Sequence, residues 1–224
     1  MTSAEVSRET VGRRLFGSRL ETALLFEDLL RTVGVERGLV GPREAARMWD
    51  RHILNCAVIS PAIPDGSTVI DVGSGAGLPG LVLAIARPDL HVTLLEPLLR
   101  RSRFLGEAVE ALGLPDVAVR RGRAEELHGH VTADVVTARA VAPLHRLAGW
   151  CLPLVRPGGC LLAMKGDRAE EELREAERVL RRLGAGSWSV EMLGAGVVDP
   201  PVRLVRVVRG VAARRLPPGR HGTA

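Results

Sequence analysis

Short β-rich runs alternate with segments of helical periodicity along residues 67–209, and this alternation constrains the fold more than any other feature of the sequence. Strands joined through helices run parallel with right-handed crossovers, so the helices cover both faces of the sheet. We therefore expect an α/β fold with a mostly parallel, seven-stranded sheet that ends in an antiparallel pair. The strands are expected at residues 67–73, 90–96, 116–122, 133–139, 158–166, 187–193 and 202–209.

Helices are predicted between these strands and ahead of the first one, whereas residues 1–14 are expected to be frayed. The chain then divides into an N-terminal helical segment packed on the core (1–60), the main α/β domain (61–210) and a basic, flexible tail (211–224). The helices are expected at residues 18–33, 42–60, 79–86, 102–113, 143–155 and 167–184, the last one capped by Asp167.

The composition indicates a folded protein with a polyanionic partner. Apolar residues make up 46% of the chain, enough for a sizeable core. The N-terminus has no apolar stretch of a secretory signal, and no apolar run approaches the about 20 residues that span a bilayer. Cys56, Cys151 and Cys160 lack the spacing of a metal site and are expected to be reduced and buried. These features predict a cytoplasmic protein without a metal or a membrane, and we also expect it to be a monomer. The net charge of +5 and the pI of about 10.2 favour a polyanionic partner.

The segment Val69–Gly80, VIDVGSGAGLPG, places four glycines between a predicted strand and a predicted helix. A glycine-rich turn at this junction lets a nucleotide approach the backbone closely. Two patterns overlap here, G-x-G-x-G from Gly73 and G-x-G-x-x-G from Gly75. The second pattern suits a nicotinamide dinucleotide, whose ribose carboxylate is expected about 20 residues further on, where Glu96 stands. Spacing alone therefore leaves both NAD(P) and another adenosine cofactor open.

The acid at Asp71 favours a cofactor without phosphate. A carboxylate two residues before the loop repels a pyrophosphate, whereas it attracts the sulfonium and ammonium groups of S-adenosylmethionine. Glu96, at the end of the second strand, is placed to take the two ribose hydroxyls through both oxygens. Ala124 and Glu125, after the third strand, are placed to meet the adenine edge. The alternatives are a turn or helix-capping acid at Asp71 and a plain strand-end acid at Glu96.

A helix followed by Pro157-Gly158-Gly159 and an apolar strand is a pattern common to class I methyltransferases, which have a Rossmann-like fold. Further motifs occur in an order and spacing that resemble one family of these enzymes over roughly residues 15–210. They are WDRHILN (49–55), DVGSGAGLPG (71–80), LLEPLLRRSRFL (94–105), GRAEE (122–126), ARAVAPL (138–144) and AMKG (163–166). The chain thus resembles the ribosomal RNA small subunit methyltransferase G family, also called the glucose-inhibited division protein B family.

This resemblance implies transfer of a methyl group from S-adenosylmethionine to N7 of one guanine in the decoding-region loop of 16S rRNA. The family's cofactor contacts carry over to Gly73, Leu78, Ala124, Glu125 and Arg139. Leu78 stands where the family more often has an aromatic residue, and ILNCAV and GLVGPRE also depart from its pattern, near the N-terminal contacts with RNA. Together with the loop and its acids, the predicted cofactor site is Asp71, Gly73, Gly75, Gly77, Leu78, Glu96, Ala124, Glu125 and Arg139.

No general base is expected, because N7 of guanine carries an in-plane lone pair and loses no proton when it is methylated. Catalysis would come from placing N7 in line with the sulfonium methyl. The catalytic residues stay unassigned, with Arg139 near the cofactor or base and Lys165 toward RNA phosphate or the base as candidates. The alternative for Arg139 is a structural pair with Asp134 or Glu125, and His52 is expected to be a packed or capping histidine.

RNA binding should draw on arginines whose phosphate contacts make the affinity fall with salt, and the partner is expected to be 16S rRNA or the small ribosomal subunit. Two other functions stay open on the residues alone. One is an NAD(P)-dependent oxidoreductase, against which Asp71 argues, and the other is a non-catalytic, ribosome-associated RNA-binding protein. The arginines are Arg100, Arg101, Arg103, Arg120, Arg121, Arg123 and the pair Arg214 and Arg215 in the tail.

Overall fold

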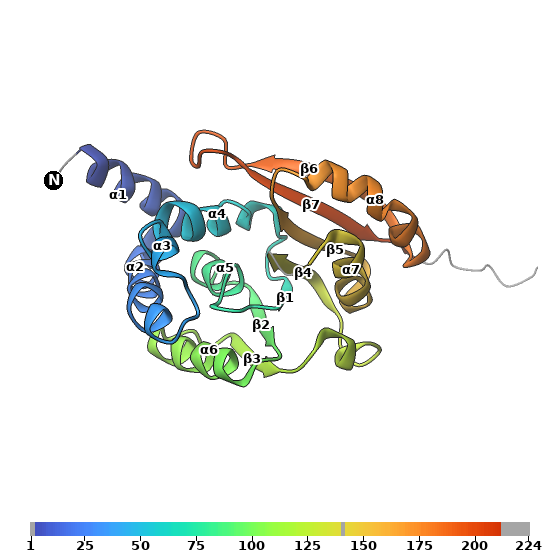
Figure 1. Cartoon of the computed structure of the whole chain (residues 1–224), viewed down its shortest axis with the longest axis horizontal. Coiled ribbons are helices and arrows are strands. Elements are labelled where there is room, and N and C mark those ends of the chain that lie inside the picture. The colour runs from blue at the N-terminus through green and yellow to red at the C-terminus, as the bar shows by residue number, and fades with distance from the viewer. Residues whose placement is uncertain (1–2, 140–141, 212–224) are drawn as a thin grey trace, which may run out of the picture.

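One mixed β-sheet forms the centre of the molecule (Figure 1). The computed structural model describes residues 3–139 and 142–211, with side chains from residue 8 onward. Within these residues, seven strands form the sheet in the order β3-β2-β1-β4-β5-β7-β6. The strands are β1 (Thr68–Val72), β2 (His91–Glu96), β3 (Val117–Arg121), β4 (Ala133–Arg139), β5 (Val155–Lys165), β6 (Ala185–Leu193) and β7 (Val202–Arg209).

The strands from β3 to β5 run parallel, whereas β7 is antiparallel to both β5 and β6. The central strand is β1, in which Val69 pairs with Val92 of β2 on one side and with Val135 of β4 on the other. The strand order reverses between β1 and β4, and ligands of such sheets bind in the crevice at the carboxyl ends of the strands there. The predicted fold class, with its antiparallel C-terminal pair, is confirmed.

Helices connect the strands and precede them. The segment ahead of β1 is broken into short pieces, including two turns of π-helix, η2 (Leu30–Gly34) and η3 (Met48–Ile53). A 3₁₀ turn, η5 (Ala124–Leu127), follows β3. The α-helices are α1 (Ser3–Phe16), α2 (Leu20–Leu29), α3 (Pro42–Ala45), α4 (Leu54–Ala57), α5 (Gly80–Ala86), α6 (Leu99–Ala111), α7 (Leu144–Cys151) and α8 (Ala169–Arg182).

The two faces of the sheet bury two separate apolar clusters. Successive side chains of a strand point to opposite faces, so Val69 of β1 joins one cluster and its neighbour Ile70 joins the other. The first cluster contains residues of α1, α2, α4, α5 and α6, and the second contains residues of α7 and α8. Helices therefore cover both faces, as Figure 1 shows with α5 and α6 on one side and α7 and α8 on the other.

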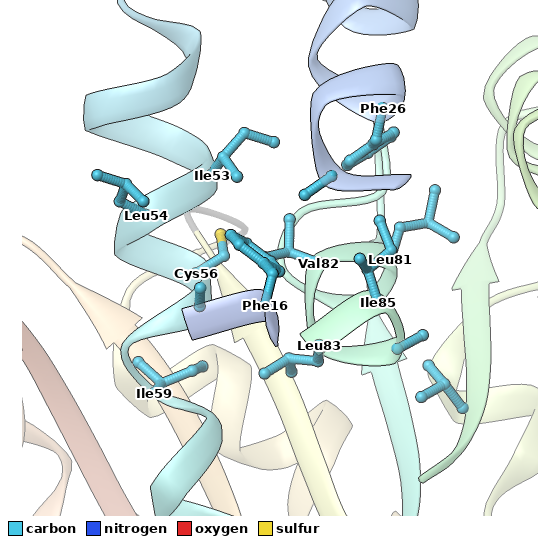
Figure 2. Packing of buried hydrophobic residues seen from close by; sticks show 14 of the residues in the cluster. Phe16, Phe26, Ile53, Leu54, Cys56, Ile59, Leu81, Val82, Leu83 and Ile85 are labelled. Carbon is cyan, nitrogen blue, oxygen red and sulfur yellow. The ribbon is translucent and has the colours of Figure 1, made fainter. Parts of the chain in front are cut away.

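The expectation of a frayed N-terminus is wrong, because residues 3–16 form α1. Phe16 at its end is 4% exposed and lies with Phe26 of α2 over the α5 residues Leu81 and Val82 (Figure 2). Arg8 pairs with the buried Glu27 of α2 and also stacks over a tryptophan ring. A weak local pattern is thus overridden by packing, since an amphipathic helix gains most of its stability from the surface that it covers.

Two boundaries differ from the prediction for reasons of tertiary structure. Strand β5 begins at Val155 rather than at residue 158, because Val155 pairs with Ala133 before a register shift in β4. Helix α8 begins at Ala169 and has no side-chain cap, because the carboxylate of Asp167 instead accepts a hydrogen bond from Arg203 at 2.7 Å. Both partners lie too far away in the sequence for a local pattern to reveal them.

The predicted tail lies outside the described residues beyond Val211, and so do Arg214 and Arg215. In the part of the chain that the structure describes, no helix has the length and hydropathy of a membrane span. The three cysteines are free and buried, as expected.

Candidate active site

A loop of left-handed glycines follows β1 and forms the floor of the candidate site. Gly73, Gly75 and Gly77 have φ values of +72°, +58° and +94°, a region that favours glycine. A Cβ at Gly75 would meet nothing closer than the Gly73 oxygen at 3.7 Å, so this part of the loop faces open space. A Cβ at Gly77 would lie 2.5 Å from Leu81, so this glycine is required by the close approach of α5. Gly75 thus leaves open space above the loop, whereas Gly77 serves packing.

Asp71 lies beneath this loop rather than in the open. Its side chain is fully buried, and its two oxygens accept hydrogen bonds from the Gly80 N–H at 3.0 Å and the Thr137 hydroxyl at 3.1 Å. Burial raises the pKa of Asp71 to about 6, although the Gly80 hydrogen bond acts in the opposite direction. The expectation of a carboxylate that faces a bound cation is therefore corrected. Asp71 holds the loop against the first residue of α5, which corresponds to the alternative of a turn or capping acid.

Glu96 connects the end of β2 to the same loop. One carboxylate oxygen accepts the Gly75 N–H at 2.9 Å, and the other accepts the Leu98 N–H at 2.9 Å. Each carboxylate oxygen has two lone-pair sites, so both oxygens retain the capacity for one further donor. The side chain is 2% exposed and is held rigidly at the wall of a cavity.

This cavity, here called the main cleft, has a volume of about 580 Å³. Its floor is the glycine loop with Leu78, and its opposite side is formed by the helical segment that contains Met48. Clefts of a few hundred cubic ångströms with a few polar groups are typical ligand sites. Of the predicted cofactor residues, the main cleft brings together Gly73, Gly75, Leu78, Glu96 and Arg139.

A smaller cavity of about 160 Å³, here called the side pocket, adjoins the main cleft and shares Gly73 and Pro97 with it. Ala124 and Glu125 of η5 line the side pocket, as do Val72, Leu95 and Trp150. The pocket is small and mostly apolar, dimensions that suit a planar heterocycle. Two further predicted cofactor residues, Ala124 and Glu125, therefore lie beside the main cleft, whereas Asp71 and Gly77 line neither cavity.

Three side chains border both the main cleft and a further cavity of about 630 Å³, here called the outer cavity. These side chains, the shared wall, are Glu44, His52 and Arg139, and each lines both cavities. Arg139 donates a hydrogen bond to Nδ1 of His52, and Nε2 of His52 lies 2.7 Å from Glu44 Oε2. Because a guanidinium can only donate, Nδ1 is the acceptor and Nε2 carries the hydrogen that Glu44 accepts.

The surroundings of His52 keep it neutral. Burial and the neighbouring Arg139 guanidinium lower the pKa of His52, whereas Glu44 acts in the opposite direction. Arg139 also donates to Sγ of Cys56 at 3.2 Å, so it is held by the segment ahead of β1. The alternative pair of Arg139 with Asp134 is wrong, because Asp134 pairs with Arg156.

Comparison with protein families decides between the alternatives that the glycine pattern leaves open. The model of the family described as rRNA small subunit methyltransferase G matches residues 19–198. The chain belongs to this family. It is therefore a methyltransferase that uses S-adenosylmethionine, and the oxidoreductase and non-catalytic alternatives are excluded.

Individual relatives agree with the family. The ribosomal RNA small subunit methyltransferase G of Thermobifida fusca is 60% identical over 87% of this chain and 82% of the relative. The protein of the same name from Salinispora arenicola is 56% identical over 95% and 94% of the two chains. Among solved structures, an O-methyltransferase family protein from Burkholderia thailandensis superposes with a TM-score of 0.55 at 17% identity, covering 88% of this chain and 73% of that one. At 17% identity, the similarity to the Burkholderia thailandensis structure shows a shared fold alone.

The site fits the cofactor of this family in size and in donor set. The main cleft and the side pocket are adjacent, because Gly73 and Pro97 line both, and together they offer room for an adenosine and an amino-acid chain. At the junction, Glu96 keeps acceptor capacity for hydroxyl donors. No group of three or more metal-binding side chains occurs within the described residues.

Lys165, the other catalytic candidate, is engaged in structural contacts. Its Nζ lies 2.8 Å from Glu172 Oε2 and donates to the Ala142 carbonyl at 2.6 Å. The same Glu172 oxygen accepts the Leu144 N–H at the start of α7. Lys165 lines the outer cavity, but its charge is already neutralised. This favours a structural role for Lys165 in joining β5, α7 and α8.

Sequence reasoning missed Glu44, Met48 and Trp150 as wall residues. A signal existed for the first two, because Glu44, Met48 and His52 recur every four residues on a predicted helix and therefore share a face. No comparable signal existed for Trp150, which reaches the side pocket from α7, far along the chain from η5.

Proposed function

We propose that this protein transfers the methyl group of S-adenosylmethionine to N7 of a single guanine in the decoding-region loop of 16S rRNA. Methylation of guanine N7 in 16S rRNA is the activity of its family. The observation that carries the assignment to this site is the alignment of the glycine loop, Glu96 and η5 at the ends of three adjacent strands, beside cavities of fitting size.

In this proposal the cofactor extends from the side pocket into the main cleft. The adenine lies in the side pocket between Ala124 and Trp150, with Glu125 at its edge. The ribose hydroxyls donate to Glu96, which is the strand-end carboxylate that an adenosine ligand requires. The amino-acid portion lies over Gly73 and Gly75, where the backbone leaves room. Asp71 acts indirectly, by holding the loop.

Arg139 suits the carboxylate of the amino-acid portion. Charge-assisted hydrogen bonds to a carboxylate are about twice as strong as neutral ones, and the Nε hydrogen and one Nη1 hydrogen of Arg139 are not used by its contacts with His52, Arg51 and Cys56. Arg139 lines the main cleft, and three contacts from the segment around His52 hold it there. We therefore assign Arg139 to cofactor binding.

Chemistry at N7 requires little of the protein beyond placement. The bound cofactor supplies an electrophilic methyl group, and the N7 lone pair forms the new bond while the sulfur keeps the electron pair of the old one. No proton is gained or lost, so the neutral His52 and the paired Lys165 need not act as a base. The contribution of the side chains is the proximity and alignment of the two reactants.

RNA backbone binding is proposed for arginines at the β3 edge of the sheet. Arg100, Arg101 and Arg103 lie on α6, which packs against β2 and β3, and Arg120 and Arg121 lie on β3. Within the described residues, none of these guanidiniums has an ion pair, so they are free to neutralise phosphates. Arg101 also lines the main cleft, so this surface, with Arg123, is continuous with the site.

The test is methylation of a defined acceptor by the purified, monomeric protein. Small ribosomal subunits from cells that lack the gene, and naked 16S rRNA, are incubated with the methyl-labelled cofactor. The modified position is then mapped by chemical cleavage at 7-methylguanine. We expect one labelled guanine. Labelling at another atom or at many guanines would contradict the proposal, and size-exclusion chromatography with light scattering tests the monomeric state.

A further inference from the structure

The outer cavity is a feature of the described residues that the cofactor leaves unexplained. It has a volume of about 630 Å³ and touches the main cleft through the shared wall. This volume is within the range of small-molecule sites and is sufficient for a nucleotide. A methyl acceptor must lie next to the cofactor, and the outer cavity adjoins the main cleft through the wall that contains Arg139.

The charges that line the outer cavity favour an anionic occupant. Its three acids are already engaged, because Glu172 pairs with Lys165, Asp167 pairs with Arg203, and Glu44 lies in the shared wall with His52 and Arg139. Two cations are not engaged: within the described residues, the guanidiniums of Arg47 and Arg51 make no hydrogen bond or ion pair. The unneutralised charge of the cavity is therefore positive, which suits the phosphates that flank a nucleotide in RNA.

A side-chain amide completes the lining. Asn55 is half-buried in the wall of the outer cavity, and it makes none of the hydrogen bonds found among the described residues. It is the only asparagine in the chain, which also contains no glutamine, so no other side chain of this protein offers an amide donor and acceptor together. The amide nitrogen and oxygen are open to the cavity, so they are available to a polar ligand.

These residues come from one short stretch of chain. Arg47 precedes the π-helical turn η3, Arg51 lies within it and Asn55 follows it in α4, and all three line the outer cavity. Glu44 and His52, from the same stretch, belong to the shared wall. One short segment therefore presents a row of free polar groups to the outer cavity and closes the main cleft at the same time.

We propose that the outer cavity binds the target guanosine after it is extruded from the RNA, and that Asn55 orients its base. The amide NH₂ donates to guanine O6, and the amide oxygen accepts guanine N1–H. Arg47 and Arg51 contact the adjoining phosphates. Enzymes that modify a base in this way take it out of the stack and bind its Watson–Crick edge. With that edge held by Asn55, N7 stays free to face the main cleft past the edge of the shared wall, whose three side chains border both cavities.

This inference rests on the proposed function and names the substrate side of the same site. Asn55 is a positioning residue for the base, since N7 itself receives no contact from it. A carboxylate at this position could accept guanine N1–H and the N2 amino group instead. Asn55→Asp should therefore retain binding of guanine, whereas the apolar isostere Asn55→Leu should not.

The test measures single-turnover methylation of 16S rRNA at subsaturating RNA, together with cofactor affinity by calorimetry. Asn55→Leu should lower the rate about 10- to 100-fold with an unchanged cofactor affinity, since one two-bond base contact is worth about that factor. Asn55→Asp should stay within about threefold of the unaltered protein. An unchanged rate for Asn55→Leu, or an equal loss of cofactor affinity, would overturn the inference.

Inosine at the target position separates the two pairing schemes, because it has O6 and N1–H but lacks the N2 amino group. The unaltered protein should methylate it within about threefold of guanosine, whereas Asn55→Asp should lose about tenfold. A large loss with the unaltered protein would place the contact at N2 and overturn the pairing proposed here.

The arginines are tested by the salt dependence of RNA binding. Arg47→Gln and Arg51→Gln should each reduce the slope of log affinity against log salt by about 0.7, the value for one phosphate contact on a single strand. Arg178→Gln on α8, an exposed arginine outside the outer cavity, is the matched control and should leave the slope unchanged. Slopes equal to the control for both variants would overturn the phosphate assignment. Failure of the unaltered protein to methylate any N7 would instead refute the proposed function.

Discussion

Arg139, at the carboxyl end of β4, donates a hydrogen bond to Nδ1 of His52, which lies 87 residues earlier in η3. This contact holds the segment ahead of β1 at the carboxyl end of the sheet. Glu44 accepts a hydrogen bond from the other ring nitrogen of His52, Nε2. The main cleft and the outer cavity therefore share one wall. The protonation state of His52 follows from its burial and from the charges of Arg139 and Glu44 on either side of it.

The pKa of His52 should respond in opposite directions to its two neighbours. Burial and Arg139 lower this pKa, and Glu44 raises it. Arg139→Met should therefore raise the pKa of His52, and Glu44→Gln should lower it further. Titration of the imidazole resonances by NMR measures both. A pKa shift of the same sign in both variants would contradict the arrangement in which His52 lies between Arg139 and Glu44.

Glu96→Gln should weaken cofactor binding by about 1.5–3 kcal/mol, the range of hydrogen bonds to charged groups. The amide keeps the size of the side chain but accepts through one oxygen only, so it cannot serve Gly75, Leu98 and two ribose hydroxyls together. Calorimetry with S-adenosylmethionine measures the change. Glu110→Gln on α6, an exposed acid outside the cleft, is the control. An unchanged dissociation constant would remove Glu96 from the site.

Trp150→Leu should weaken cofactor binding about 2- to 10-fold, the loss expected when an aromatic partner worth about 0.5–1.5 kcal/mol is removed. Trp150 lines the side pocket, whereas Trp188 of β6 lies under Arg181 on the opposite edge of the sheet. The matched control Trp188→Leu should bind the cofactor normally. Intrinsic fluorescence gives a second reading, since the change on cofactor addition should disappear in Trp150→Leu alone.

Asp71→Asn should alter how stability depends on pH. The folded pKa of Asp71, about 6, exceeds its ordinary value of 3.8, so the folded state holds this proton more tightly than the unfolded state. Its contribution to stability is fully present below pH 3.8 and is lost as the pH rises to about 6. Urea unfolding across this range should show a smaller loss with rising pH in Asp71→Asn than in the unaltered protein. Identical slopes for both would show that Asp71 ionises normally.

Lys165→Met should lower the free energy of unfolding by about 3 kcal/mol, because it leaves the Glu172 carboxylate without its partner in a largely enclosed site. The double variant Lys165→Met with Glu172→Gln should recover part of this loss. Cofactor affinity should be unchanged in both, since Lys165 does not line the main cleft. A stable Lys165→Met protein without methylation activity would instead assign Lys165 to the chemistry.

Local patterns along the chain were sufficient for the sheet, the glycine loop and the position of Glu96. The hydrophobic periodicity of a strand or a helix is visible within a few residues of the chain. A strand that ends in a run of glycines likewise predicts a ligand-binding turn from the local sequence. For the same reason the sequence predicted the antiparallel pair β6 and β7. The family motifs then separated a methyltransferase from a dinucleotide enzyme, which the glycine spacing alone could not do.

Only the tertiary structure decided what each charged side chain does. Asp71 is turned under the loop by Thr137, 66 residues away, and Arg139 is held by the segment around His52 rather than by Asp134. The N-terminal residues that we expected to be frayed form the packed helix α1 for the same reason. Secondary structure is encoded by neighbours in the chain, whereas the partner of a charge is whichever group the fold brings within hydrogen-bond distance.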